Sequence, residues 1–352
     1  MVFHQIVATF HALFDVIGIP GNFLVIVTTV LERRFHVMRY ILLASLAVSD
    51  ILCLTLANSF RIGSIAQQRW LYGGTMCDLN PSFVRYFYFN SVLHLMAVSY
   101  ERYNAIVKSP LTYDGTMTKC KTMLVALIWI VPIPFSIGPF LGFGNYVYNP
   151  EVFFCEQGWS VHSDSMARNI ISYAIFSFLL PFLVIVFLNW RVFRTAKALQ
   201  INPVANNLSC FDDSDCKRQQ QNQRNKIILR KKREQKAAAD VNIIIIAFLL
   251  CYLPGWITGI FRQFVKDIKV TAEVILTTTG VYFFSSVCNP IIYSLRKREF
   301  HKGFNEVVRC MTLQKNSSIL DENVNPFSSF SVRARAFSSR NIPVSDFSDG
   351  QD

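Results

Sequence analysis

The sequence predicts an all-α membrane protein, a bundle of seven membrane-spanning helices. Only 16% of its 352 residues are charged and 52% are hydrophobic, whereas soluble domains typically carry about 25% charged residues. A helix that crosses a bilayer needs roughly 20 mostly apolar residues. The stretches that meet this requirement are 10–31, 41–65, 79–100, 122–143, 169–190, 240–262 and 271–294. They lack the two-residue alternation of a membrane β-barrel.

The basic residues predict how these spans are oriented. Lys and Arg gather in the segments that follow the first, third and fifth spans, and the last of these, 191–236, is the most basic. By contrast, 135–167 contains no Lys or Arg. Because basic loops stay in the cytoplasm, the N-terminus is expected outside the cell and the C-terminus inside. The net charge of +12 then reflects topology and contact with anionic membrane lipids, and no nucleic-acid partner is expected.

Composition predicts the remaining boundaries. Residues 1–9 form a short extracellular N-terminus, and 10–294 hold the spans, with a polar and flexible third inner loop at about 195–236. Residues 295–310 place basic and aromatic side chains at helical spacing, which predicts a short amphipathic helix on the inner leaflet. The remainder, 311–352, is rich in Ser, Asn and Asp and is expected to be a disordered cytoplasmic tail.

Charged residues inside spans are costly, so they indicate function. Asp50 lies deep in the second span, Glu101-Arg102-Tyr103 ends the third, and Asn289-Pro290-Ile291-Ile292-Tyr293 ends the seventh. From about Gly21 to Cys310, the chain resembles a rhodopsin-like G-protein-coupled receptor. The resemblance implies a plasma-membrane receptor, not an enzyme, that couples an extracellular ligand to a heterotrimeric G protein. Receptor kinases and arrestin are implied as further partners.

The resemblance also implies a set of activation residues. Arg102 is expected to pair with Glu234 and so clamp the third span to the sixth. The alternative is that Arg102 is an interfacial anchor whose side chain reaches water. Leu111, in the second inner loop, matches an apolar residue that contacts the G protein in the family. Arg102 is also expected to contact the G protein. The other implied activation residues are Glu101, Tyr103, Phe248, Tyr252, Pro254, Asn289, Pro290 and Tyr293.

A sodium site is implied around Asp50. Ser91, Ser286 and Asn289 occupy the positions that surround this aspartate in the family and coordinate the ion, and oxygen ligands suit a hard cation. The alternative is a protonated Asp50 that forms hydrogen bonds without an ion. Tyr252 stands where the family has tryptophan, which weakens the case for sodium.

Three cysteines carry expectations. On the predicted topology only Cys77, at the start of the third span, and Cys155, after the fourth, face the oxidising side of the membrane. We expect them to form a disulfide, and two free thiols are the alternative. Cys310 follows the basic segment after the seventh span and is a candidate for palmitoylation, with an inert cysteine as the alternative.

Departures from the family indicate what the ligand is not. Val84 replaces the aspartate with which amine receptors bind an ammonium group, so a simple monoamine is not expected. Phe283 replaces the lysine that holds retinal in visual pigments. Without that amine no Schiff base forms, so no retinal and no other covalent cofactor is expected.

The outer ends of the spans carry positive charge instead. Because arginine binds carboxylates and phosphates bidentately, Arg61 and Arg85 predict an anionic ligand, with a short peptide as the next choice. In the alternative, Arg85 pairs with Glu156 or Asp78 and only fixes the outer loop. The predicted ligand-binding residues are Arg61, Val84, Arg85, Tyr88, Tyr252 and Tyr282. Other functional alternatives are a receptor for a non-classical amine or a lipid, and a seven-helix transporter or channel.

Overall fold

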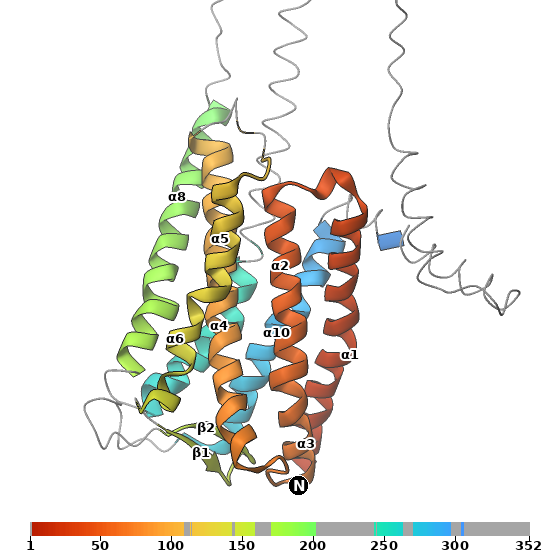
Figure 1. The fold of residues 1–352 in the computed structure, drawn as a ribbon, viewed down its shortest axis with the longest axis vertical. Helices are drawn as coiled ribbons and strands as arrows, with labels where there is room; N and C mark the ends of the chain where they lie inside the picture. The colour runs from red at the N-terminus through yellow and green to blue at the C-terminus, as the bar shows by residue number, and fades with distance from the viewer. Residues whose placement is uncertain are drawn as a thin grey trace, which may run out of the picture.

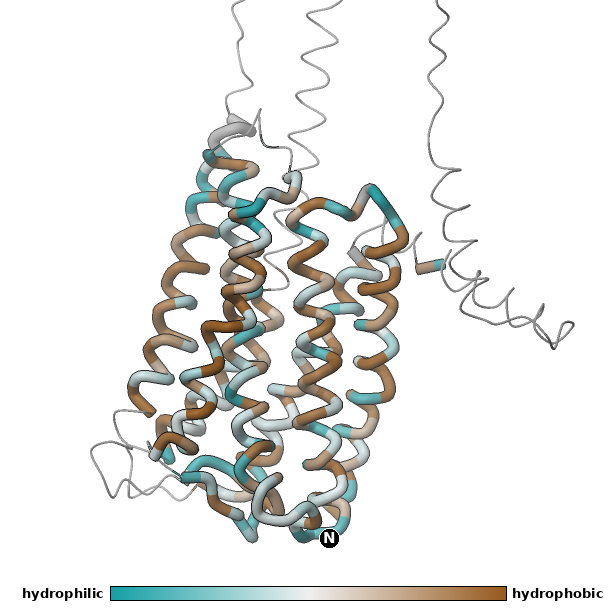
Figure 2. Tube along the Cα trace, in the orientation of Figure 1, coloured by the Kyte–Doolittle hydropathy of each residue, from teal (hydrophilic) through white to brown (hydrophobic). Residues whose placement is uncertain are grey.

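Long helices lie side by side in the computed structural model, and a small β-hairpin covers the end of the bundle at which the chain begins (Figure 1). The structure describes residues 2–108, 113, 115–142, 145–158, 170–201, 243, 245–262, 270–296 and 304–305. Apolar residues run along most of each helix, and hydrophilic ones gather toward the two ends (Figure 2). This distribution suits a bundle whose middle lies in hydrocarbon.

The helices correspond to the seven predicted spans. The first is α1 (Val2–Leu31), and the second is α2 (Met38–Cys53), η2 (Leu54–Asn58) and α3 (Ser59–Gln67). The third is α4 (Gly73–Tyr103), followed by η3 (Asn104–Lys108), and the fourth is α5 (Lys119–Ile130) with α6 (Pro132–Ser136). The fifth contains η5 (Ile175–Leu179) and α8 (Leu180–Ile201), the sixth is Ile245–Arg262, and the seventh is α10 (Ala272–Arg296). Short 3-10 turns, η1 (Arg33–Phe35) and η4 (Gly138–Leu141), lie between them.

Helix α4 lies in the interior of the bundle. Among the described helices, six are apolar enough over their length to cross a membrane by composition alone, and α4 is not one of them. It packs against α2, α6 and α8 and against the hairpin, and it buries polar residues such as Asn90, His94 and Arg102. A helix whose neighbours are other helices needs fewer apolar side chains than one that faces lipid.

Two glycines bring α1 close to its neighbours. A Cβ atom added to Gly21 would lie 2.9 Å from Cγ of Pro290 on α10, and one added to Gly18 would lie 2.6 Å from Cδ1 of Leu54. Both distances are too short for a real side chain. At Gly21 the obstacle is a proline ring, so glycine is required there, whereas at Gly18 it is the flexible end of a leucine side chain. The helix itself begins at Val2, eight residues before the predicted span. The placement of residues 1–9 outside the membrane stays a prediction.

The hairpin was not predicted from the sequence. Its strands, β1 (Tyr146–Asn149) and β2 (Phe154–Gln157), pair antiparallel with Val147 opposite Glu156. A disulfide joins Cys155 in β2 to Cys77 in the first turns of α4, so the predicted pairing is confirmed. Each strand has four residues, which is too short for a period-two pattern to be recognised.

Several predictions fall on residues that the structure does not describe. They are the partner Glu234, the G-protein contact Leu111, the palmitoylation candidate Cys310, most of the third inner loop, and the tail 311–352. Of the predicted amphipathic helix 295–310, the described residues are Leu295 and Arg296 at the end of α10, and Phe304 and Asn305. All of these remain predictions.

Candidate functional site

The last turn of α4 contains a buried charge pair, on the side that the predicted topology places in the cytoplasm. The Nε atom of Arg102 lies 3.7 Å from Oε2 of Glu101, and the hydroxyl of Tyr113 donates a hydrogen bond to Oε1 of Glu101 at 3.3 Å. Arg102 is only 1% exposed. A side chain that reaches out to water would be exposed, so the interfacial-anchor alternative does not describe Arg102.

The carboxylate of Asp50 joins α2 to α10. Its Oδ1 accepts a hydrogen bond from the hydroxyl of Ser286 at 2.8 Å, and its Oδ2 accepts one from the amide of Asn289 at 2.7 Å. Asp50 and Ser91 are both buried. The carboxylate of Asp50 and the hydroxyl of Ser286 are oxygen ligands of the type that a small hard cation requires. Their chemistry suits a sodium ion. The participation of Ser91 and the binding of the ion remain predictions.

Tyr252, in the sixth helix, lies at the centre of an aromatic cluster. Its ring stacks on Phe248 with centroids 3.8 Å apart and contacts Tyr88 at 4.7 Å and Tyr282 at 5.1 Å. Its hydroxyl accepts a hydrogen bond from Ser285 at 3.1 Å. The bulky side chain expected at this position is therefore packed between the third and seventh spans, and its polar atom is satisfied.

A cavity of about 480 Å³ opens between the helices at the hairpin end. All six predicted ligand-binding residues line it: Arg61, Val84, Arg85, Tyr88, Tyr252 and Tyr282. The volume lies within the range of roughly 300–1,000 Å³ that is typical of sites for small molecules. The structure thus brings these side chains to one place, while their contact with a ligand remains a prediction.

The sequence analysis missed several lining residues, and three of them make polar or ring contacts around the cavity. Trp256 of the sixth helix stacks on Tyr173 and donates its indole N–H to the hydroxyl of Tyr88. Tyr173 donates its hydroxyl to the backbone oxygen of Arg85 at 2.9 Å. Arg262 is the last described residue of the sixth helix and lines the same cavity. The only sequence signal for them was their position near the outer ends of the fifth and sixth spans.

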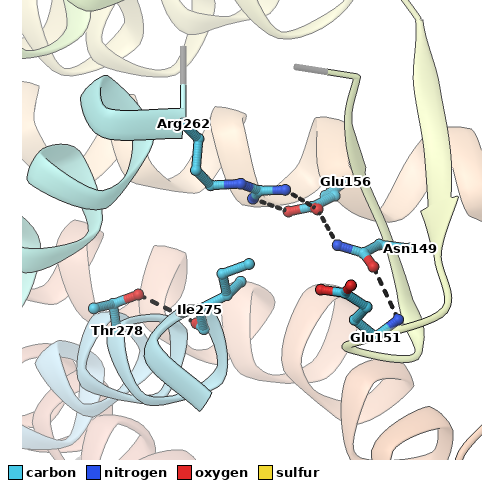
Figure 3. A network of polar contacts seen from close by, with 6 residues as sticks. All are labelled: Asn149, Glu151, Glu156, Arg262, Ile275 and Thr278. Atoms are coloured by element: carbon cyan, nitrogen blue, oxygen red, sulfur yellow. Dashed lines mark hydrogen bonds and ion pairs between the residues drawn. The ribbon is translucent and has the colours of Figure 1, made fainter. Parts of the chain in front are cut away.

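Charged residues are unevenly distributed in this cavity. Among the described lining residues, Arg61, Arg85 and Arg262 are basic and Glu156 is acidic. Figure 3 shows Glu156 held by Arg262, with its Oε2 2.6 Å from Nη1 and its Oε1 2.5 Å from Nη2. The amide of Asn149 also donates to Oε1 of Glu156 at 2.6 Å. This carboxylate is therefore already neutralised by a bidentate pair.

Arg85 holds the hairpin, but not in the way that was expected. Its Nη1 donates to Oε1 of Gln157 at 2.9 Å, and its guanidinium lies over the ring of Tyr173 at 4.1 Å from the centroid. Glu156, one of the two partners named in that alternative beside Asp78, is instead engaged by Arg262. The sequence reasoning found the correct segment of the loop and chose the neighbouring residue, because the register of the hairpin was unknown.

Comparisons with known proteins identify the family of this chain. Residues 21–293 match the family described as 7 transmembrane receptor (rhodopsin family). The chain is 28% identical to octopamine receptor beta-1R of Drosophila melanogaster over 84% of its own length and 59% of that receptor. It is 30% identical to octopamine receptor beta-2R of Chilo suppressalis over 84% of its own length and 77% of that receptor.

A solved structure supports the same fold. The crystal structure of squid rhodopsin superimposes with a TM-score of 0.78 at 19% sequence identity, over 97% of this chain and 93% of that one. At this identity the likeness concerns the fold only. The family match extends over most of the chain, and therefore this protein belongs to the rhodopsin family of seven-transmembrane receptors.

Proposed function

We propose that the protein is a plasma-membrane receptor that couples an extracellular ligand to a heterotrimeric G protein. The observation that carries the proposal is that α4 contributes to two separate sites. Arg85 lines the outer cavity and Arg102 belongs to the buried charge pair at the other end of the same helix. They lie roughly 25 Å apart, at 1.5 Å per helical residue. A rigid helix that reaches both sites is a physical connection between ligand and G protein.

A ligand screen with a G-protein readout tests this proposal. Cells that express the receptor are exposed to panels of carboxylates, phosphates, short peptides and amines, and G-protein dissociation is measured. At least one ligand should activate the wild type and fail on Arg102→Ala at equal surface density. Antibody access to epitopes at the two termini of intact cells measures topology, with the N-terminal epitope expected to be accessible. Equal activation of both receptors would contradict the role of Arg102.

For the ligand, the charge of the cavity favours a carboxylate or a phosphate. Glu156 is already paired with Arg262, and two further arginines line the same space. Arginine binds such anions bidentately, which supplies orientation as well as energy. An ammonium ion would instead enter a cavity with an excess of positive charge.

An amine is the second candidate, and one comparison favours it. The relatives described above are named octopamine receptors, and Glu156 provides one carboxylate in the cavity lining. A substitution separates the candidates. Glu156→Gln should abolish activation by an amine that pairs with this carboxylate, and it should leave an acidic agonist active.

A further inference from the structure

We propose that Arg61, rather than Arg85, binds the acidic group of the ligand. The subsite lies between α3, α10 and β2, and the rest of the ligand is an aromatic or apolar body that occupies the part of the outer cavity lined by aromatic rings. This inference rests on the proposed function and specifies its ligand-binding contact.

Arg61 is a buried cation enclosed by aromatic rings. It is 4% exposed, and its guanidinium carbon lies 4.0 Å from the ring centroid of Phe154 in β2 and 5.7 Å from that of Phe283 in α10. Its Nε atom has no hydrogen-bond partner among the described residues. Ring faces attract a guanidinium, but they accept no conventional hydrogen bond and replace its lost water only in part.

The carboxylate that lines the same cavity as Arg61 is Glu156. Both oxygens of Glu156 are already engaged, by the two terminal nitrogens of Arg262 and by the amide of Asn149. Within the described lining of the cavity no other carboxylate is present. Arg61 is therefore the cation whose charge the ligand-free cavity compensates least.

Arg85 is in a different situation. Its guanidinium donates to Gln157, and its backbone oxygen accepts from the hydroxyl of Tyr173, over whose ring the same guanidinium lies. These contacts connect the third span to β2 and to the fifth span. Arg85 is thus a positioning residue of the cavity wall, and removing it disturbs structure in addition to charge.

The aromatic side chains of the cavity lining indicate the rest of the ligand. Tyr88, Tyr173, Tyr252 and Trp256 line the cavity with their rings. Their polar atoms are largely occupied: Tyr252 accepts from Ser285, Tyr88 accepts from Trp256, and Tyr173 donates to Arg85. A surface of rings with satisfied polar atoms favours aromatic or apolar groups. The ligand is accordingly an amphipathic acid, with its acidic group at one end.

The first test needs no ligand. The full-length receptor is purified in detergent, and the melting temperature of the ligand-free protein is measured. Arg61→Met removes a buried, poorly compensated charge and should raise the melting temperature by ~2 °C or more. Arg85→Met is the matched control. It removes the contact with Gln157 and should lower the melting temperature.

The second test uses defined probes. Melting temperatures are recorded with 3-phenylpropionate, its neutral amide, phenethylamine, acetate and inorganic phosphate. The aromatic acid should stabilise the wild type and Arg85→Met, and should have no effect on Arg61→Met. Arg61→Lys keeps the charge without the bidentate geometry and should weaken the apparent affinity about tenfold. Acetate and phosphate lack the aromatic body and should act only at higher concentration.

The outcomes separate the two proposals. If the acid stabilises the wild type and Arg61→Met alike but not Arg85→Met, the acidic-ligand proposal stands and the assignment of Arg61 is wrong. Stabilisation by phenethylamine alone would overturn the acidic ligand itself. If no probe affects the wild type, the melting temperatures of the ligand-free proteins provide the test. A rise confined to Arg61→Met supports the assignment. A fall like that of Arg85→Met would show that Arg61 is a structural residue.

Discussion

Arg262 at the end of the sixth helix and Glu156 in strand β2 form a bidentate ion pair, with nitrogen–oxygen distances of 2.6 and 2.5 Å. The two side chains are 16% and 11% exposed, so the pair is partly shielded from water and is stronger than a surface salt bridge. It connects the helix that carries Tyr252 to the hairpin that borders the outer cavity. A large displacement of this helix relative to the hairpin would break the pair.

This pair should stabilise the inactive receptor. Arg262→Gln and Glu156→Gln are each expected to raise ligand-independent G-protein activation, because a partly buried charge-assisted contact contributes ~1–2 kcal/mol. That energy corresponds to a shift of roughly five- to thirtyfold in the balance between two states. The double variant should resemble either single one. Additive increases in basal activity would show that the two residues act separately.

The charge pair Glu101–Arg102, at the end of α4 away from the hairpin, should also stabilise the inactive receptor. Glu101→Gln removes the carboxylate next to Arg102 and should raise basal activity, and Glu234→Ala should do the same if Glu234 clamps Arg102 to the sixth span. Tyr113→Phe, which removes only the hydrogen bond to Glu101, should have a smaller effect. Nucleotide exchange at matched surface density is the measurement. An unchanged basal level in Glu101→Gln and Glu234→Ala would mean that packing alone holds these helices.

The Cys77–Cys155 disulfide can be tested by comparing the two single serine variants with the double variant. Cys77→Ser and Cys155→Ser should each lower surface expression and ligand binding, because either change removes the covalent link between β2 and α4. The double variant should lose no more than each single variant, since a disulfide is lost completely when one partner is removed. Surface labelling of intact cells and ligand binding provide the measurements. A larger loss in the double variant would argue against a shared bond.

Sodium binding at Asp50 predicts a salt-specific gain in stability. At constant ionic strength, replacing N-methylglucamine chloride by sodium chloride should raise the melting temperature of the purified wild type. An ion at 100 times its Kd stabilises the folded state by about 2.7 kcal/mol. Asp50→Asn removes the anionic ligand and should show no difference between the two salts. A protonated Asp50 without an ion would instead leave the wild type insensitive to the exchange.

The sequence predicted the helices well because their signal is local. Each span is a run of apolar residues of nearly fixed length, and the window 79–100 of α4 was identified in the same way as the others. The Cys77–Cys155 bond followed from topology. The six residues predicted to bind the ligand line one cavity because their positions along helices of known register determine which way they face.

Contacts of the outer loop could not be predicted in this way. Arg262 and Glu156 are 106 residues apart in the sequence, and their pairing depends on the register of a hairpin whose strands are too short to be recognised. For the same reason, the alternative for Arg85 named Glu156 or Asp78 as its partner and did not name Gln157, to which its Nη1 donates. A local pattern specifies a helix face, whereas the partner of a loop residue depends on the whole fold.

The close contact between α1 and α10 gives the last prediction. Gly21→Ala would place a Cβ atom 2.9 Å from Cγ of Pro290, and neither a proline ring nor the helix backbone yields easily. Overpacking of this kind costs typically about 1–3 kcal/mol, so Gly21→Ala should lower the melting temperature and the surface expression. Gly255→Ala is the matched control, because a Cβ atom at this position meets nothing within 4 Å and alanine favours the helix. Equal stability of the two variants would show that α1 can move away from Pro290 at no cost, and that this packing does not fix the position of the first span.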